Sequence, residues 1–410
     1  IKTLNFDSWK DEPKYEFIKQ QIQEKYNASK MIIDAGVQVS GLNEMMVETS
    51  KNGLSDVTND LQTKKDNADK IDQGLFYDID PTKIKSSTTD NSVSSTDKNN
   101  NLYSANSELP FSYSVRKVKD GTTYKVKDNT KFIHSLGGTE RKYEFTFQNY
   151  SSSNLTLYFV YKIERNPSNN AKYDLQIKVN DQEITATHLD ENSLKLNKVN
   201  KIYLAKIALT NLNYGDNKIE FIKKNGGYKN VVFGDISLMR APTEDKELAY
   251  FNKLNGQTIG DDGLLTVSIY DAIGGSTQYD SFFEKKSIDG KDHVFLNKVG
   301  KFDRKNANYT LVVYAPEAGT YKVSITYEKS SEASKVNIKT FGGNDNNTLQ
   351  NATGTIEISA DSTNTNQVGT TDINSSNLMV NLTKGWNNLV LGEQNQKFPN
   401  LEYMYFKKVS

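Results

Sequence analysis

The chain of 410 residues carries 51 basic and 51 acidic side chains, three histidines and no cysteine. This length predicts two or three domains, and the balanced charge excludes a long-range field that would favour nucleic acid or an anionic membrane. The absence of cysteine excludes disulfides, thiolate metal sites and a cysteine nucleophile within these residues, and is more typical of a bacterial chain than of a secreted eukaryotic one.

The sequence begins at Ile1 without a charged and apolar leader, and it has no apolar run of about eighteen residues. We expect a processed or trimmed extracellular segment. Any export signal or anchor would lie upstream of it.

Residues 1–80 are predicted to form a helical stalk, because their apolar residues recur three and four positions apart, as one face of a helix requires. Gly36, Gly41 and Gly53 interrupt this pattern, and a Ser-Asp pair after Gly53 can cap a further helix. We expect two or three helices in a hairpin or small bundle, with the aromatic and methionine side chains in its core. The two apolar stripes are Ile18, Ile22, Tyr26, Ile33, Val37 and Leu54, Val57, Leu61, Ala68, Ile71.

Residues 81–107 are rich in Ser, Thr and Asn and contain too little apolar surface for a core, so they are predicted to be a linker or a long exposed loop. A second boundary is expected at the short Pro-containing stretch around Pro242. These two boundaries define β-domains at residues 108–242 and 243–410.

Strands are predicted from the period-two alternation that follows residue 109, for example in YEFTF (143–147) and LTLYFVY (155–161). Many short strands separated by turn-rich segments indicate an antiparallel β-sandwich.

An internal repeat shows that there are two such domains. Six apolar or aromatic positions between Tyr143 and Tyr161 recur 166 residues later, between Tyr309 and Tyr327. A G-x-N-x-[IL] segment at residues 215–219 recurs 170 residues later, and the segment 228–231 is aligned with 398–401 at the same offset. A period of this size is a domain, which predicts two tandem copies after the helical segment.

The strings APEAGTYKVSI (315–325), KGWNNL (384–389) and NLEYM (400–404) resemble carbohydrate-binding modules of the galactose-binding-like, jelly-roll β-sandwich type. The resemblance implies that the G-x-N-x-I segment forms a turn leading into a core strand. It also implies that the segment 400–404 belongs to the strand that completes a sheet. The predicted fold class is therefore mainly β with an N-terminal α-helical segment, followed by two tandem antiparallel β-sandwiches.

A narrower resemblance lies in YEFTFQNYSSSNLTLYFVY (143–161) and AKIALTNLNYGDNKIEF (205–221), which look like the haemagglutinin domain of the variable lipoprotein haemagglutinins of mycoplasmas. It covers most of the chain from about residue 107 onward. It implies an antigenically variable, lipid-anchored adhesin on the extracellular face of the bacterial membrane. Its expected partners are host glycans or sialoglycoproteins and host antibodies, and contact with the membrane is expected only through an anchor outside this segment. The anchoring cysteine of that family is missing here.

The resemblance to carbohydrate-binding modules also nominates ligand-binding residues, because an Asn before the last strand and a nearby aromatic often contact sugar there. Carried over by position, these are Asn400 with Phe398 and Asn230 with Tyr228. The alternative is structural, since such an Asn commonly satisfies local backbone and the aromatic commonly packs. Glu402 stands where the modules prefer Asp.

Trp386 is a further candidate contact residue, because the equivalent position in the first copy is Asp216 and the turn is expected to be exposed. An exposed Trp there would contact either a ligand or a neighbouring domain.

A metal site and a catalytic centre find little support in the sequence. The oxygen-rich run at residues 342–347 is better explained as a turn than as a calcium loop. Carbohydrate-binding modules of the fold that this sequence resembles often bind structural Ca²⁺, so a metal site elsewhere in the chain is left open. His134, His188 and His293 lie in unrelated contexts, and no hydrolase or phosphate-binding motif accompanies them. Paired carboxylates are left open, but no enzymatic activity is expected.

Three functions follow from these observations. The leading hypothesis is a cell-surface adhesin or haemagglutinin that binds a host glycan or glycoprotein, with a sialylated glycan as the suspected ligand. The alternatives are a structural or immune-decoy coat protein without specific binding, and an ancillary carbohydrate-binding module of a surface glycosidase. No nucleic-acid partner is expected.

Overall fold

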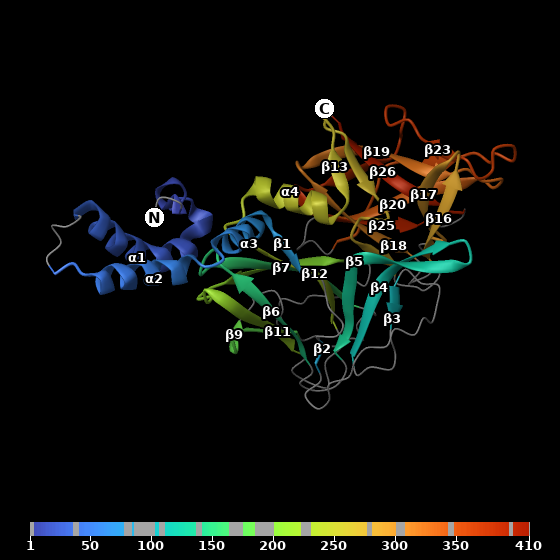
Figure 1. The fold of residues 1–410 in the computed structure, drawn as a ribbon. Coiled ribbons are helices and arrows are strands. Elements are labelled where there is room, and N and C mark those ends of the chain that lie inside the picture. Colours follow the sequence, from blue (N-terminus) through green and yellow to red (C-terminus); the bar gives the residue numbers. More distant parts are fainter. Residues whose placement is uncertain are drawn as a thin grey trace.

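The computed structural model confirms the predicted fold class, since it is mainly β and begins with a helical segment. Figure 1 shows the helices projecting from one side of two β-rich bodies. The structure describes residues 4–35, 41–77, 84–85, 103–105, 111–136, 142–163, 175–184, 201–222, 231–276, 281–300, 308–342, 348–392 and 397–409.

Three α-helices form the N-terminal segment, and local signals set their ends. The Asn43 side chain accepts a hydrogen bond from the Met46 amide at 2.9 Å and starts the second helix, while Gly74 ends the third with a φ of 99°. The predicted stripe residues Ile18 and Ile22 are fully buried among aromatic side chains. The elements are η2 (Phe6–Ser8), η3 (Pro13–Tyr15), α1 (Glu16–Ala35), α2 (Glu44–Thr58) and α3 (Leu61–Gln73).

The third helix, α3, packs on the first β-body. Its Ile71 is fully buried in the core of that body, and the Ile71 carbonyl accepts a hydrogen bond from the Arg240 amide at 3.1 Å. Asp72 pairs with Lys246 at 2.8 Å. The strand that follows α3 pairs directly with β12, so the helical segment is joined to the sheet by backbone as well as by side chains.

The first β-body is a sandwich. One sheet has the order β10-β7-β12-β5-β4, with β1 on β12 and β3 on β4, and the other has the order β2-β6-β11-β8-β9. Aromatic side chains from both sheets meet between them, and the ring centroids of Phe221 and Phe233 lie 4.7 Å apart. The strands are β1 (Leu75–Tyr77), β2 (Ile84–Lys85), β3 (Tyr103–Ala105), β4 (Phe111–Asp120), β5 (Thr123–Leu136), β6 (Lys142–Asn149), β7 (Leu155–Ile163), β8 (Gln176–Val179), β9 (Gln182–Ile184), β10 (Tyr203–Leu209), β11 (Gly215–Ile222) and β12 (Val231–Met239).

The second β-body is built in the same way. Strands β19, β26, β14 and β13 are neighbours in one sheet, with β23 and β24 on β19 and β17 on β26, and the facing sheet has the order β15-β18-β25-β20-β21, with β22 on β20. The strands are β13 (Gln257–Ile259), β14 (Leu265–Ser268), β15 (Gly274–Ser276), β16 (Phe282–Ile288), β17 (Lys291–Asn297), β18 (Tyr309–Ala315), β19 (Gly319–Glu328), β20 (Ser334–Gly342), β21 (Gln350–Asn351), β22 (Ile356–Ile358), β23 (Val368–Thr370), β24 (Met379–Leu382), β25 (Gly385–Gly392) and β26 (Leu401–Lys408).

Strand pairing reproduces the sequence repeat. In the first sandwich β6 pairs with β11 and β7 with β12, and in the second β18 pairs with β25 and β19 with β26. Asn149 lies opposite Gly215 just as Ala315 lies opposite Gly385, which matches the offsets of 166 and 170.

The last strand departs from the predicted alignment. Leu157 lies opposite Leu238, whereas the equivalent residue Val323 lies opposite Phe406. The closing strands are therefore related by an offset of 168, so the predicted equivalence of Val231 with Leu401 at 170 is wrong by two residues. The rest of that predicted alignment, at residues 228–230, lies outside the described residues. The same face of the strand stays inward because a shift of two preserves the alternation.

The G-x-N motif has the same structural role in both sandwiches. Gly385 has a φ of 89°, and the buried Asn387 side chain accepts from the Thr383 amide at 2.9 Å and donates to the Thr383 and Gly385 carbonyls at 2.8 Å. In the first copy Asn217 makes the equivalent bonds to residues 213 and 215. Asparagine fits because one amide both accepts and donates within a single tight turn.

An apolar layer holds the two sandwiches together. It is centred on α4 (Glu244–Leu254), which connects them, and packs Tyr250 and Phe251 between Tyr158 of β7 and Val312 of β18. The rings of Phe251 and Tyr314 stack with their centroids 4.6 Å apart. Burying each such side chain contributes about 1.5–3 kcal/mol, so the layer fixes how the two sandwiches sit.

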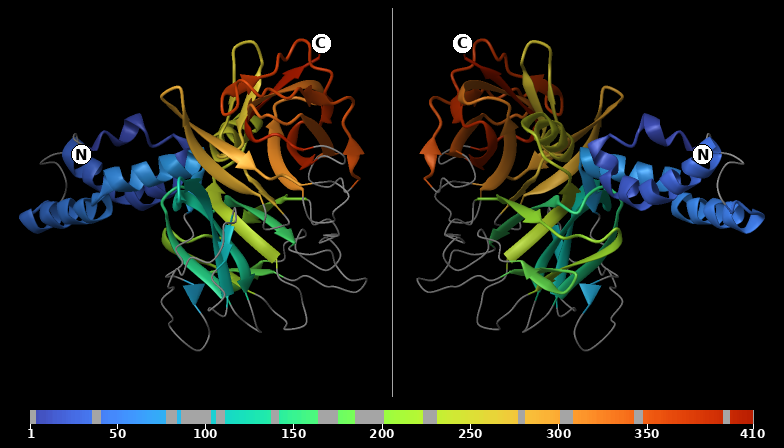
Figure 2. Two further views of the ribbon diagram at one scale, coloured as in Figure 1. Left: turned by 90° about the vertical axis from the view of Figure 1, so that its right-hand side faces the viewer. Right: turned by 90° about the vertical axis from the view of Figure 1, so that its left-hand side faces the viewer.

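One further contact continues the sheet from one sandwich to the other. Strand β4 of the first sandwich pairs in parallel with β16 of the second, with Val118 opposite Phe283. Figure 2 shows the resulting body from two sides, with the helical segment extending away from it in both views.

We predict that Asn387→Ala lowers the free energy of unfolding by about 1–3 kcal/mol, because it leaves a buried amide and two carbonyls without their partner. The loss is measured as a lower midpoint in thermal unfolding followed by circular dichroism. The exposed Asn351→Ala is the matched control and should leave the midpoint unchanged. An unchanged midpoint for Asn387→Ala would contradict the role given to the motif.

Candidate functional site

The five residues nominated from the sequence fall into three groups. Tyr228 and Asn230 lie outside the residues that the structure describes. Phe398 and Trp386 are buried, with exposed fractions of 4% and 5%. Asn400 lines a surface pocket.

The nomination of Phe398 as a stacking platform is corrected by its burial. Its ring belongs to the core of the second sandwich, where it packs with inward-facing strand residues. A ring without an accessible face cannot stack on a sugar, so the structural alternative weighed from the sequence applies at this position.

The expectation that Trp386 is exposed is also wrong. Its indole N–H donates to the Ile202 carbonyl at 2.9 Å, and its ring meets the Phe251 ring edge to face with centroids 5.7 Å apart. The adjacent Asn388 accepts from the Ile202 amide at 2.8 Å and donates to its carbonyl at 2.9 Å. Of the two contacts considered for Trp386, the structure shows the one with the neighbouring domain.

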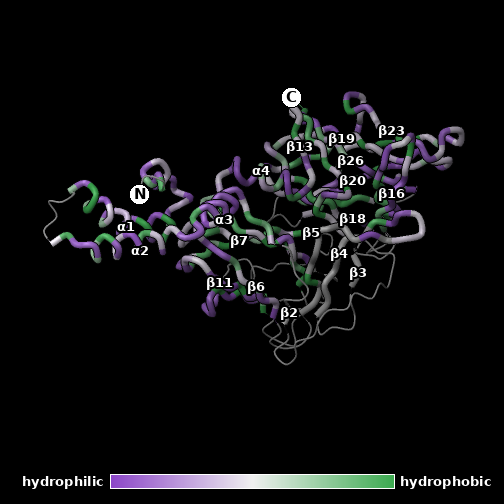
Figure 3. Tube along the Cα trace, in the orientation of Figure 1, coloured by the Kyte–Doolittle hydropathy of each residue, from purple (hydrophilic) through white to green (hydrophobic). Residues whose placement is uncertain are grey.

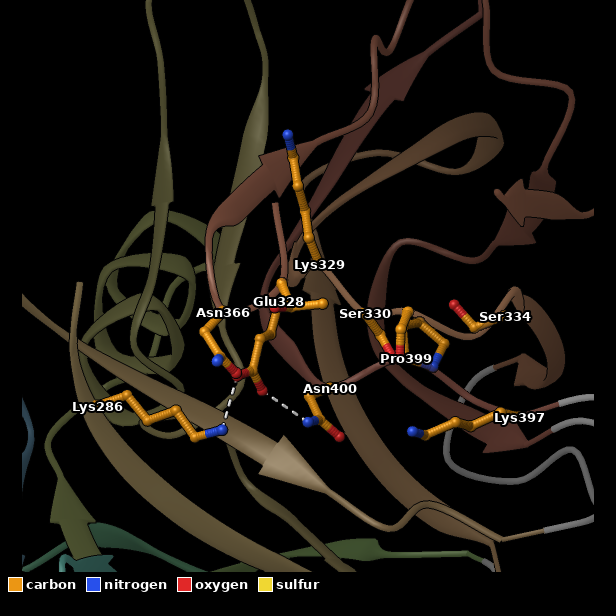
Figure 4. A pocket seen from close by; sticks show the side chains of 11 residues that line it. Lys286, Glu328, Lys329, Ser330, Ser334, Asn366, Lys397, Pro399 and Asn400 are labelled. Atoms are coloured by element: carbon orange, nitrogen blue, oxygen red, sulfur yellow. Dashed lines mark hydrogen bonds and ion pairs between the residues drawn. The ribbon is translucent and has the colours of Figure 1, made fainter. Parts of the chain in front are cut away.

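The pocket at Asn400 has a volume of about 230 Å³ and lies where β19 ends, beside the loop before β26 and the strand β16. Figure 4 shows the side chains of Lys286, Glu328 and Asn400 converging in it. Its lining residues are polar except for one proline, and they are Lys286, Glu328, Lys329, Ser330, Ser331, Ser334, Thr365, Asn366, Lys397, Pro399 and Asn400.

A nearly buried carboxylate organises this pocket. Glu328 is 6% exposed, and it accepts hydrogen bonds from Lys286 Nζ at 2.6 Å and from Asn400 Nδ2 at 2.7 Å. Because a carboxylate only accepts hydrogen bonds, the Asn400 amide must turn its nitrogen toward Glu328. Its carbonyl oxygen is thereby left on the other side of the amide, as Figure 4 shows, where it can accept a hydrogen bond from a hydroxyl group.

Lys286 is itself held in a row of alternating charges. Its Nζ lies 3.5 Å from Glu284, and Glu284 accepts from Lys119 Nζ at 3.0 Å and from Asn297 at 3.3 Å. Lys119 belongs to β4, so the first sandwich contributes to the network that positions the pocket of the second. Each buried or half-buried charge in the row has a partner of opposite sign, which offsets its desolvation.

The opposite wall of the pocket carries a second cation. Lys397 is half-exposed and lies 3.0 Å from the exposed carboxylate of Glu332. In Figure 4 the ammonium groups of Lys286 and Lys397 lie on opposite sides of Asn400, whereas the side chain of Lys329 points away. The floor between the two cations therefore offers amide and carboxylate groups.

The loop that brings Asn366 to the pocket is built around Asp361. This carboxylate accepts from the backbone amides of Thr363 at 3.2 Å and Asn364 at 3.0 Å. Hydrogen bonds, first from the Asn364 side chain and then from that of Thr363, lower the pKa of Asp361 to about 2. Its charge and the loop's hydrogen bonds therefore persist throughout the physiological pH range.

Part of the corresponding face of the first sandwich is covered. At the offsets given by strand pairing, Val160 corresponds to Thr326 and Val232 corresponds to Asn400. Both valines are buried in the apolar layer around α4. At the position of Val232 and Asn400, the first copy thus packs an apolar residue against its neighbour, whereas the second copy lines a surface pocket with an amide.

Sequence reasoning missed Glu328, Lys286 and the pair His293–Glu402. His293 lies on β17, which pairs with β16, and it stands opposite Lys286 in the sheet. Its Nδ1 lies 2.8 Å from the Glu402 carboxylate. These residues are distant in sequence and carry no motif, so only the strand register brings them together. The one available signal in the sequence was that Glu328 and Glu402 stand near the ends of their strands, at positions where the alternation predicts a polar residue.

Neither a metal cluster nor a membrane helix is found in the described part of the chain. No three His, Asp or Glu residues there gather closely enough to hold a metal ion. The oxygen-rich run at 342–347 lies almost entirely outside the described residues, so its interpretation as a turn remains untested. None of the described helices combines the length and apolar character that crossing a membrane requires.

Trp9 and Trp386 are the two tryptophans of the chain, which allows the burial of Trp386 to be measured directly. We predict that the Trp9→Phe variant, with Trp386 as its only tryptophan, is shielded from iodide quenching in the native state. The same variant unfolded in urea provides the control and should be quenched strongly. Strong quenching of the native variant would show that Trp386 is exposed.

Comparison with solved structures matches several carbohydrate-active proteins at low similarity. A family 35 carbohydrate-binding module from Clostridium thermocellum is 15% identical, with a TM-score of 0.26 over 34% of this chain and 96% of the module. A GH26-CBM35 β-(1,4)-mannanase from Podospora anserina is 14% identical, with a TM-score of 0.26 over 36% of this chain and 28% of the enzyme. An isomalto-dextranase from Arthrobacter globiformis T6, complexed with panose, is 11% identical, with a TM-score of 0.28 over 74% of this chain and 36% of the enzyme.

No curated protein matches the sequence. A family model described as Mycoplasma haemagglutinin matches residues 91–196, which confirms over that stretch the resemblance predicted from the sequence.

Proposed function

We propose that this chain is a non-catalytic surface protein that binds a glycan through the pocket of its second sandwich. The observation that carries the proposal is the nearly buried Glu328, which holds Lys286 and Asn400 in fixed positions at an accessible surface. A fixed array of amide, carboxylate and ammonium groups is suited to the hydroxyl groups of a sugar. The match of residues 91–196 to a haemagglutinin family supports the same function.

The preferred ligand class in this proposal is a host glycan with an anionic sugar, such as a sialylated one. The ammonium groups of Lys286 and Lys397 flank the Asn400 amide and can form ion pairs with the carboxylate of a ligand. The amide and the serine hydroxyls can form hydrogen bonds with sugar hydroxyl groups. The described lining includes no aromatic ring, so a single site would bind weakly. Many copies on one cell would raise the overall strength of attachment.

The biological setting is proposed from the resemblance. In that setting the chain attaches a bacterium to host cells, is held at the extracellular face of the membrane by a lipid anchor, and varies in its exposed loops under pressure from host antibodies. A structural Ca²⁺ is proposed on the same basis, and a fall in the unfolding temperature on adding a chelator would support it.

The test is binding of the chain, displayed in many copies on beads, to a glycan array with and without sialidase treatment. We predict that Asn400→Ala and Lys397→Ala each reduce binding about tenfold, because each removes one polar contact worth roughly 1.5 kcal/mol. Lys291→Ala is the control, since Lys291 is exposed and does not line the pocket.

Thermal unfolding of each variant separates a loss of binding from a loss of folding. Absence of binding to any glycan at high micromolar concentration would overturn the proposal and favour a coat protein that binds nothing specifically. Binding that sialidase leaves unchanged would retain the glycan-binding function and overturn the anionic ligand class.

A further inference from the structure

An unusual concentration of exposed apolar side chains lies on the helical hairpin formed by α1 and α2. Of the eight large apolar side chains that are exposed in the described part of the chain, five lie on these two helices, and they are Met31, Ile33, Met45, Met46 and Val47. Figure 3 shows hydrophobic segments on both helices in the part of the hairpin remote from the sandwiches. Single exposed apolar residues need no explanation, but a concentration of them on one element indicates an interface.

The exposed residues continue stripes that are buried elsewhere. On α1 the stripe starts with the fully buried Ile18 and Ile22 and reaches Ile33, which is 62% exposed. The expectation that the methionine side chains lie in the core of the bundle is wrong, since Met31, Met45 and Met46 are exposed. On α2 the buried Leu54 is followed toward the tip by the exposed Val47. Both stripes extend beyond the core that the monomer provides.

Between these stripes lies a groove, here called the hairpin groove, with a volume of about 620 Å³. Aliphatic side chains line it, mixed with small hydroxyl residues that allow close approach of another helix. The residues that face it from α2 include Val47, Lys51 and Leu54. In a helix bundle this position is occupied by a further helix.

The charges beside the hairpin groove favour a second copy of this chain as the occupant. Glu44, Val47, Lys51 and Leu54 follow the three-four spacing of one helix face, so an acid and a base lie seven residues apart on it. Neither Glu44 nor Lys51 forms an ion pair with any residue that the structure describes. If two α2 helices cross antiparallel with their two-fold axis between residues 47 and 48, each Lys51 lies opposite the other copy's Glu44.

We propose that two copies of the chain associate through their α1–α2 hairpins, which pair antiparallel as a four-helix bundle. A two-fold interface requires a self-complementary surface, and a face of α2 that carries an acid at Glu44 and a base at Lys51, with the apolar Val47 between them, satisfies this requirement. The net charge of zero removes long-range repulsion between copies. The hairpin projects away from the sandwiches in both views of Figure 2, so the sandwiches leave it accessible.

The experiment is sedimentation velocity of the whole chain between about 1 and 100 μM, compared with charge-reversed variants. Glu44→Lys and Lys51→Glu each place like charges opposite one another and should weaken association about tenfold or more. An equimolar mixture of the two variants pairs opposite charges at both positions and should restore association. Glu24→Lys is the control, because Glu24 is an exposed residue of α1 that does not line the hairpin groove.

Restoration in the mixture is the decisive result, since a folding defect in either variant would persist after mixing. A wild-type chain that remains monomeric at 100 μM would overturn the proposal, as would a dimer that neither charge reversal weakens. Binding of the monomer to neutral phosphatidylcholine vesicles in place of self-association would also overturn it.

Discussion

The packing of the two sandwiches against α4 is the interaction on which the rest of the molecule depends. Tyr250 and Phe251 lie between the sheets, and Trp386 and Asn388 bind the backbone of Ile202 from the other side. Burial of the aromatic side chains supplies most of the attraction, while the directional hydrogen bonds to the Ile202 backbone fix the relative orientation of the two sandwiches. The interface also decides which sheet faces remain available for ligands.

Two copies of one sequence pattern have therefore acquired different surfaces. The core positions stay apolar or aromatic in both copies, because the same alternation fills both sandwiches. The outward positions of the equivalent strands diverged, as the pair Val232 and Asn400 illustrates. Apolar residues occupy the positions where a neighbouring element covers the strand, and amide and charged residues occupy the positions that solvent reaches. The candidate site thus follows from how the copies pack as much as from the fold of either one.

Much of the fold could be predicted because periodicity reports on the local environment. The helices, the two sandwiches and the repeat all follow from spacing, and the G-x-N motif is evident from its recurrence in the sequence. The errors concern residues whose environment is set by another part of the chain. Trp386 and Phe398 have side chains suited to a sugar platform, but burial depends on partners that lie far away in sequence. Conversely, Glu328 has no motif, and its role depends on strand register.

Strand β4 has a consequence for how this architecture could have arisen. The two copies are not structurally independent, because β4 of the first copy extends a sheet of the second and Lys119 completes its charge network. After duplication the copies became mutually dependent, so excising the second one would remove a strand neighbour and uncover α4. Exchange of sequence between related proteins would then be tolerated when it replaces loops or both sandwiches together. An exchange that joins the first sandwich of one protein to the second sandwich of another would be tolerated poorly.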